Sequence, residues 1–213
     1  MNEYGFTVKK TDTLRNQVYK DIKSAIIRGK IQPGTRLREN DISKEMGVSR
    51  GPIREAILLL ESEGLLVTQT HKETMVAKVE QDEVTMLLNP LRVLLESFSI
   101  HKTLPNLNES SIQDLEKILD ELNQACKEND IETIVEKDLE FHGYLVSLTG
   151  EPYLITLWKS VSSRIVFHFM TNTREKHQTD NFSKLINEHR ELLEAIKTKN
   201  WGFIEPILRE HIY

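Results

Sequence analysis

From about residue 80 onward, apolar residues recur every three or four positions, and this period limits the possible folds more than any other feature. Prolines, glycines and asparagines interrupt the pattern and mark helix ends. We expect six helices, at about residues 82–102, 109–128, 131–149, 153–170, 182–199 and 201–213. Pro90 either kinks the first of these or, with Asn89 as a cap, starts a new helix. The sequence therefore predicts an all-α helical bundle.

The first 79 residues follow a different pattern of short segments. Apolar residues spaced by four over residues 14–26 predict one helix, and a second is expected at residues 39–46. Gly47 ends the second helix, and Ser49 follows as the probable N-cap of a third. Two helices joined by a few residues that include glycine are typical of a helix-turn-helix, whose second helix enters the major groove of DNA.

Two short β-type runs follow the third helix. Residues 65–68 and 75–77 are separated by a polar stretch and predict a hairpin, which forms the wing of a winged helix-turn-helix. The expected fold is therefore mainly α, with two domains. Residues 1–79 form the winged helix-turn-helix DNA-binding domain, and residues 80–213 form the all-α bundle.

Charge is distributed unevenly between these two parts. Residues 1–79 contain 14 Lys and Arg against 10 Asp and Glu, a net charge of +4, whereas the remainder has 14 against 23, a net charge of −9. Arg50 and Arg54 lie four apart and share a helix face that points away from the apolar stripe. They suit contacts with phosphate or guanine, although a solvated arginine pair remains an alternative.

Composition excludes several other classes of protein. No stretch approaches the roughly 18–20 consecutive apolar residues of a membrane helix, so we expect no membrane association. The N-terminus has no secretory signal, which predicts a cytoplasmic protein. Cys126 is the one cysteine, so no intramolecular disulfide can form, and the residue is expected to fill space in the core.

Ionisable residues interrupt the apolar stripes of three helices in the bundle. Asp138 and His142 share one face of the third helix, and His189 and His211 occupy equivalent places in the last two. A single buried histidine is usually a hydrogen-bonded core residue. Four such groups together favour a shared divalent metal, because unpaired ionisable groups are costly to bury.

Three motifs in the first domain resemble the GntR family of bacterial regulators. They are Ile31-Gln-Pro-Gly-Thr-Arg-Leu, Gly47-Val-Ser-Arg-Gly-Pro-Ile-Arg-Glu-Ala-Ile and Leu60-Glu-Ser-Glu-Gly-Leu-Leu. The resemblance implies that Ser49, Arg50 and Arg54 contact operator DNA, and we add Arg36 and the wing residue Lys72 to this predicted set. Two departures from the family pattern are Asn40, where many members have arginine, and a wing tip without glycine.

The second half resembles the FCD ligand-binding domain of FadR-type GntR regulators. The resemblance rests on Leu91-Arg-Val-Leu-Leu-Glu, Asp138-Leu-Glu-Phe-His, Thr149-Gly-Glu-Pro-Tyr-Leu, Glu188-His-Arg-Glu-Leu-Leu-Glu-Ala-Ile and Leu208-Arg-Glu-His. It implies that Asp138, His142, His189 and His211 bind a divalent transition metal, most commonly zinc, whose coordination an organic acid completes.

Two arginines are candidate contacts for that acid. Arg92 matches the family's arginine in the first helix of the domain and can pair with a carboxylate; its alternative is an ordinary salt bridge with Glu96. Arg164 lies four residues from His168 beside apolar residues, a spacing that would allow both to line the same cavity.

The sequence thus predicts a homodimeric transcriptional regulator, expected to be a repressor, that binds double-stranded operator DNA and responds to a small carboxylate effector. Two alternatives are a metal-dependent enzyme acting on small carboxylates and an effector-independent regulator with a structural metal. We predict no enzymatic activity, because the sequence has no His-Glu-x-x-His helix, Gly-rich phosphate loop or nucleophile elbow.

Overall fold

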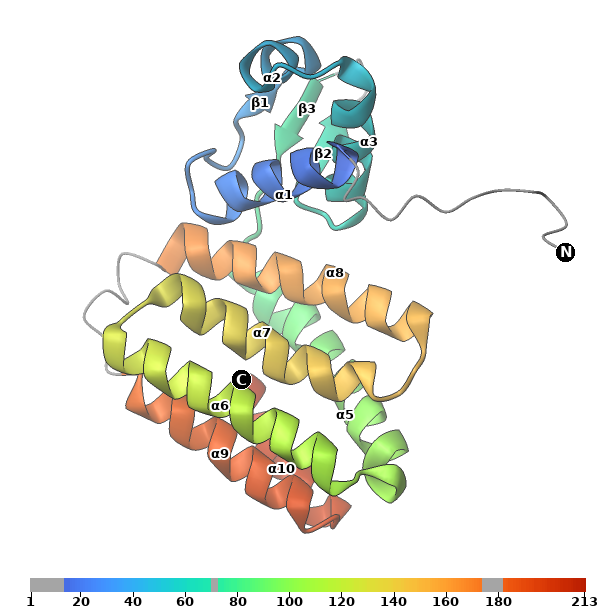
Figure 1. The fold of residues 1–213 in the computed structure, drawn as a ribbon, viewed down its shortest axis with the longest axis vertical. Coiled ribbons are helices and arrows are strands. Elements are labelled where there is room, and N and C mark those ends of the chain that lie inside the picture. Colours follow the sequence, from blue (N-terminus) through green and yellow to red (C-terminus); the bar gives the residue numbers. More distant parts are fainter. Residues whose placement is uncertain (1–13, 70–72, 174–181) are drawn as a thin grey trace, which may run out of the picture. The chain divides into compact units, whose positions relative to one another are not determined.

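The computed structural model describes residues 14–69, 73–173 and 182–213 (Figure 1). The chain divides into two compact units, Met1–Ala77 and Lys78–Tyr213. Each unit has its own buried core, and each is described separately below.

The first unit contains three helices and a small antiparallel sheet, the expected winged helix-turn-helix. Its helices are α1 (Leu14–Ile27), α2 (Glu39–Met46) and α3 (Arg50–Ser62), and its strands are β1 (Arg36–Leu37), β2 (Leu66–Gln69) and β3 (Glu73–Val76). The sheet order is β1-β3-β2. The hairpin of β2 and β3 confirms the predicted wing, whereas β1 was not predicted, because two residues are too short to show an alternating pattern.

The predicted apolar stripes form the core of this unit. Val18, Ile22 and Ile26 of α1 pack against α3, whose buried residues are Ile53, Ala56, Ile57 and Leu60. Gly47 ends α2 in the left-handed conformation with φ of 66°, which costs glycine little because it has no Cβ. Ser49 occupies the N-cap position of α3 as expected, but its side chain makes no capping hydrogen bond.

The second unit is a bundle of helices, in agreement with the predicted class (Figure 1). Its helix α6 packs against both α7 and α9, and α10 packs against α9 and α5. The core between them is built from aliphatic residues around Phe141. The elements are α4 (Gln81–Glu83), the π-helical turn η1 (Val84–Leu88), α5 (Asn89–Thr103), the 3-10 turn η2 (Leu104–Asn106), α6 (Glu109–Glu128), α7 (Ile131–Ser147), α8 (Pro152–His168), the π-helical turn η3 (Phe169–Thr173), α9 (Ser183–Lys197) and α10 (Trp201–Ile212).

Of the two possibilities for Pro90, the structure does not show a new helix capped by Asn89. The chain remains helical from α4 through α5, and Asn89 itself has helical backbone angles. The backbone N–H of Asn89 donates to the carbonyl of Val84, five residues back, in the π-helical turn η1. The wider turn lies directly before the proline, which has no N–H to offer, and so accommodates it without ending the helix.

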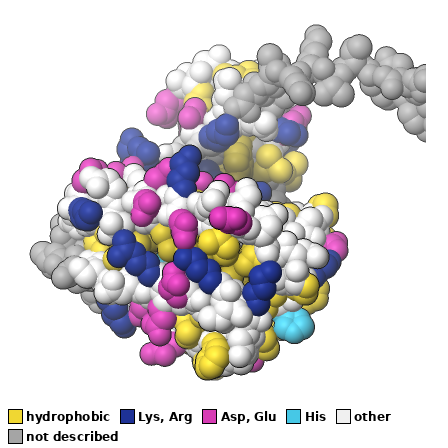
Figure 2. Space-filling view, turned by 60° about the horizontal axis from the view of Figure 1, so that its bottom comes forward, with side chains coloured by type: hydrophobic (Ala, Val, Ile, Leu, Met, Phe, Trp, Pro, Cys, Tyr) yellow, Lys and Arg dark blue, Asp and Glu magenta, His cyan; other side chains and the backbone are white. Residues whose placement is uncertain are grey.

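Charged residues of both signs are interleaved on the face of the molecule that Figure 2 shows. In the second unit, ion pairs join neighbouring helices, including Lys137 with Glu121 and Lys197 with Glu116. Cys126 packs at the edge of the core, as expected, and partial burial raises the pKa of its thiol. None of the helices within the described ranges is long and apolar enough to cross a membrane.

Candidate metal centre and DNA-binding face

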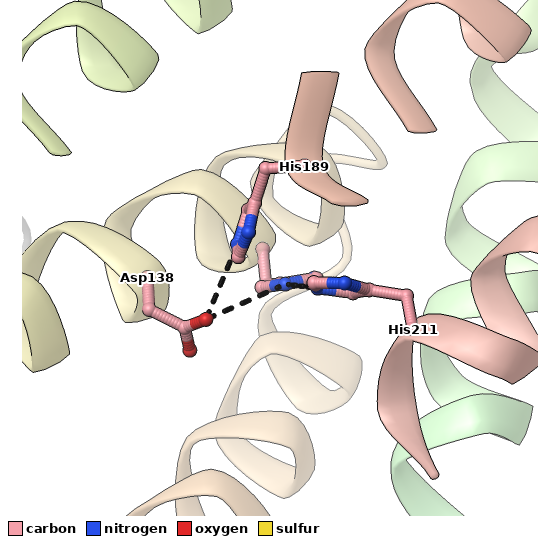
Figure 3. A group of neighbouring side chains, drawn as sticks. Asp138, His189 and His211 are labelled. Atoms are coloured by element: carbon pink, nitrogen blue, oxygen red, sulfur yellow. Dashed lines mark hydrogen bonds and ion pairs between the residues drawn. The ribbon is translucent and has the colours of Figure 1, made fainter. Parts of the chain in front are cut away.

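The four residues with predicted metal-ligating side chains lie together inside the second unit. Asp138 and His142 come from α7, His189 from α9 and His211 from α10, and Figure 3 shows the labelled side chains pointing toward one another. One candidate ligand atom from each residue lies within 4.8 Å of the other three. The Asp138 Oδ1 is 3.2 Å from the His189 Nε2, and the Nε2 atoms of His142 and His211 are 2.9 Å apart.

Burial controls the charge of this cluster. His142 and His189 are fully buried, and burial lowers the pKa of His211 to about 2, so that its ring is neutral. Burial alone would raise the pKa of Asp138, but the positive charge of Arg92 helps to hold it well below its usual range. Burial also lowers the pKa of His142, so the cluster presents the Asp138 carboxylate and the neutral rings of His142 and His211, the forms that bind metal ions.

Hydrogen bonds fix the orientation of two of the imidazole rings. The Nδ1 of His142 lies 2.7 Å from the Glu96 Oε2, and that of His189 lies 2.8 Å from the Leu185 carbonyl oxygen. The Leu185 carbonyl oxygen carries no proton, and the strongly lowered pKa of Glu96 leaves its carboxylate without one. Each Nδ1 therefore donates a hydrogen bond. In a neutral ring, the Nε2 then carries a lone pair, and both lone pairs face the centre of the cluster. Carboxylate or carbonyl partners of this kind commonly orient metal-binding histidines.

Glu96 on α5 is a functional residue that the sequence reasoning considered only as a salt-bridge partner. It is fully buried, and its carboxylate accepts from the Arg92 Nε, the Trp158 Nε1 and His142. Gly143 allows the Trp158 ring to approach α7 closely, since a Cβ there would lie 3.0 Å from the ring. The sequence does contain a signal for Glu96: polar residues recur at positions 92, 96, 99 and 103 on a buried helix face.

The cluster as it stands leaves polar atoms unsatisfied. The His189 Nε2 and His211 Nδ1 are buried without a hydrogen-bond partner, and the Nε2 atom of His142 lies directly opposite that of His211. Although the His189 Nε2 lies close to Asp138, a lone pair facing a carboxylate forms no hydrogen bond. A divalent cation held by the Nε2 atoms of His142, His189 and His211 and by Asp138 would occupy the lone pairs that face the centre, and the His211 Nδ1 would remain the one unpaired ring nitrogen of the three. Bonds of about 2.0–2.2 Å place ligand atoms within about 4.4 Å of one another, a few tenths of an ångström below the observed maximum.

A cavity of about 510 Å³ adjoins the cluster. Arg92 lines this cavity, and its Nη2 is buried without a hydrogen-bond partner, 3.8 Å from the Asp138 Oδ2. The Nε of the same guanidinium donates to Glu96, which is the salt bridge that the sequence offered as an alternative role for Arg92. The Nη2 atom makes no hydrogen bond in addition to it. The polar residues lining the cavity are Arg92, Asp138, Ser162, Lys184, Glu188 and His211.

Arg164 and His168 do not lie where the sequence reasoning placed them. Neither is among the residues that line the cavity. The Arg164 guanidinium pairs with Glu83, and the His168 ring bonds the Val79 carbonyl and the Gln81 side chain. These two residues project from a different side of α8, because positions 162, 165 and 166 face the cavity. Arg164 therefore anchors the segment before α5 and is not a contact of the cavity.

The predicted DNA-contacting residues lie on the surface of the first unit. Ser49, Arg50 and Arg54 are exposed at the start of α3, and Arg36 is exposed on β1. Lys72 lies outside the described residues.

The arginines of this surface contact acceptors of their own unit. Arg54 forms two hydrogen bonds with Glu39, of 3.0 and 2.9 Å, and Arg50 donates to Asn40 at 3.4 Å. Arg36 pairs with Glu73 across the sheet. Asn40, a departure from the family pattern, therefore contacts a predicted recognition arginine.

A winged helix-turn-helix followed by a helical bundle with a buried Asp and His cluster defines a two-domain bacterial regulator. Family models agree: residues 14–76 match the bacterial regulatory proteins of the gntR family, and residues 88–213 match the FCD domain. The chain belongs to the GntR family, in the group with a C-terminal FCD domain, and is a transcriptional regulator.

Similar proteins support this assignment. The HTH-type transcriptional regulator YdhC of Bacillus subtilis is 30% identical over 185 residues, which cover 86% of this chain and 81% of that protein. The gluconate operon transcriptional repressor of the same organism is 27% identical over 195 residues, covering 90% and 79%. The structure of Escherichia coli McbR/YncC has the same fold, with a TM-score of 0.81 at 24% identity, covering 94% and 93% of the two chains.

Proposed function

We propose that this regulator is a repressor whose operator binding is controlled by a small organic acid, bound at a divalent metal in the FCD domain. The observation that supports this most is the convergence of Asp138, His142, His189 and His211 beside a cavity. Zinc is the proposed ion, because three imidazoles and one carboxylate suit its ligand preferences. One relative is a gluconate operon transcriptional repressor, which supports both the repressor role and an acid as effector.

The metal, when bound, supplies a Lewis-acidic site for a carboxylate oxygen. The protein contributes the second half of this recognition through Arg92, whose Nη2 is buried without a hydrogen-bond partner and lies 3.8 Å from the Asp138 Oδ2. A carboxylate that reaches this atom gains a charge-assisted hydrogen bond. Glu96 holds the guanidinium in place by accepting from its Nε.

The DNA contacts are proposed for the exposed face at the start of α3. Arg50 and Arg54 project from its first two turns, the part of a recognition helix that reaches base edges. Ser49, Arg36 and Lys72 complete the proposed contact set. Arg50→Ala and Arg54→Ala are each expected to weaken operator binding.

A homodimer is proposed because one winged helix reads only half of a symmetric operator. Four apolar residues on one face of η1 and α5 support this assembly. Leu87, Leu91, Leu94 and Phe98 follow one another at steps of four, three and four, and all four are exposed. An apolar stripe of this kind is costly to leave in water, and a second copy of the chain would cover it.

The test is operator binding by the full chain, measured with zinc-loaded and metal-free protein in the presence and absence of small carboxylates. We expect one zinc per chain and a carboxylate-dependent change in DNA affinity that is lost in Arg92→Ala. Arg209→Ala, which removes an exposed arginine paired with Glu205 on α10, is the matched control.

Two results of this test would favour the other interpretations. Zinc-dependent stability with no response of DNA affinity to any acid indicates a structural metal and refutes the effector proposal. Turnover of a carboxylate by the zinc-loaded protein indicates an enzyme instead.

A further inference from the structure

Apart from the ion pair of Lys184 and Glu188, the wall of the FCD cavity is apolar beyond the end formed by Arg92, Asp138, Ser162 and His211. Among the described residues that line it, aliphatic or aromatic side chains outnumber polar ones, and they come from α7, α8, η3, α9 and the residue before α9. Examples from three of these helices are Val135, Val166 and Leu185. A ligand that fills the cavity must therefore place most of its surface against hydrocarbon.

The buried polar atoms available to a ligand are concentrated at one end. In the part of the chain that the structure describes, three residues that line the cavity have a buried atom without a hydrogen-bond partner: Arg92 Nη2, Ser162 Oγ and His211 Nδ1. Helices α5 and α8 run antiparallel, since Lys102 pairs with Glu151 while Glu96 accepts from Trp158. One helical turn further along this pairing, Ser162 of α8 lies beside Arg92 of α5. The Ser162 Oγ and the Arg92 Nη2 can therefore contact the same end of a ligand.

We infer that the ligand of this cavity is a monocarboxylate with an apolar body. This inference rests on the proposed carboxylate effector and specifies its class. The carboxylate lies at the end formed by Arg92, Ser162 and the metal cluster, and the hydrocarbon chain lies along the wall. The volume of about 510 Å³ is within the range of small-molecule sites, about 300–1,000 Å³.

The apolar wall selects against polyhydroxylated acids. Each hydroxyl buried there without a partner loses its hydrogen bonds to water, whereas each buried methylene gains free energy. The gain per methylene corresponds to roughly a three- to fourfold increase in affinity. The gluconate operon repressor is similar to this chain along most of its length, but the wall described here does not suit gluconate itself.

The experiment compares acids by calorimetric titration of the zinc-loaded full chain. Hexanoate and gluconate form a matched pair, because both have six carbons and one carboxylate. We expect hexanoate to bind at least 10-fold more tightly, and affinity to rise on the order of 100-fold from butyrate to octanoate.

Two outcomes overturn the inference in distinguishable ways. Gluconate binding as tightly as hexanoate overturns the apolar class and leaves the carboxylate effector intact. No measurable binding of any of the four acids overturns both proposals.

A pair of near-isosteric variants tests the wall directly. Val166→Thr adds a hydroxyl to the cavity surface and is expected to weaken octanoate binding roughly 3- to 10-fold while sparing acetate. Val146→Thr makes the same change at a buried position of α7 that does not line the cavity, and should leave affinity unchanged. Equal octanoate affinity in Val166→Thr and the parent protein would contradict the proposed location of the chain.

Discussion

Replacing Glu96 by glutamine should prevent His142 from binding the proposed metal, although Glu96 itself is not a proposed ligand. In the structure the Glu96 Oε1 accepts from two donors, Arg92 and Trp158, and the Oε2 accepts from the Nδ1 of His142. The amide of glutamine has one oxygen and one NH₂. If the amide oxygen faces Arg92 and Trp158, only the hydrogen bond from His142 is lost. If the oxygen faces His142, the hydrogen bonds from Arg92 and Trp158 are both lost. We therefore expect the NH₂ group to face His142.

An NH₂ group opposite the Nδ1 of His142 reverses the tautomer of the ring. The Nδ1 must then accept, and in a neutral ring the proton moves to the Nε2, where it blocks the lone pair that faces the metal site. Loss of such an orienting partner typically lowers metal affinity 10- to 100-fold, or about 1.4–2.7 kcal/mol. Arg92 also loses its main counter-charge, at an upper cost of about 3–5 kcal/mol, which Asp138 at 3.8 Å reduces.

Two measurements test this reasoning. Nitrogen-15 NMR of the metal-free variant should report a proton on the His142 Nε2, and chelator competition should report weaker zinc binding. Glu140→Gln, on the exposed side of α7 in an ion pair with Lys137, is the control and should keep zinc affinity, with a stability change below about 1 kcal/mol. An unchanged tautomer together with unchanged zinc affinity in Glu96→Gln would refute the argument.

Three further predictions address other parts of the molecule. Arg54→Ala should weaken operator binding by roughly 1–3 kcal/mol in a gel-shift titration, whereas Arg209→Ala should not. Chelation should lower the melting temperature by about 5–10 °C if zinc is present at 100 times its dissociation constant, and His189→Ala should abolish this sensitivity; equal shifts in both proteins would contradict a shared site. Leu94→Glu should convert the proposed dimer to a monomer in sedimentation experiments, whereas Phe203→Glu, at an equally exposed position, should leave the proposed dimer intact.

The fold could be predicted largely because local pattern and tertiary burial agree. The stripes of α1 and α3 become the core of the first unit, and Gly47 ends α2 as its lack of a Cβ allows. The prediction is ambiguous where one local sequence signal is compatible with two backbone conformations. Pro90 is such a signal, because helix initiation and a π-helical turn both accommodate a missing N–H, and only the packing around the segment decides between them.

The candidate site could be predicted from the sequence where helix periodicity determines the side of the helix to which a side chain points. Asp138 and His142 are four apart and point to one side of α7 whatever the tertiary structure. Arg164 was misplaced because its neighbours on both sides of the helix are apolar, so the pattern did not distinguish the cavity from the contact with Glu83. Ser162 was overlooked since a serine in a helix carries no signal of an unsatisfied hydroxyl.

Helix α8 contacts both the cavity and the segment by which the chain enters the FCD domain. Ser162 and Val166 line the cavity, while Arg164 and His168 of the same rigid helix hold residues 79–83, the segment by which the chain enters the domain. Any ligand that displaces α8 therefore displaces this entry segment as well. Thermodynamic linkage makes the relation reciprocal: if the acid changes DNA affinity tenfold, operator DNA must change affinity for the acid by the same factor.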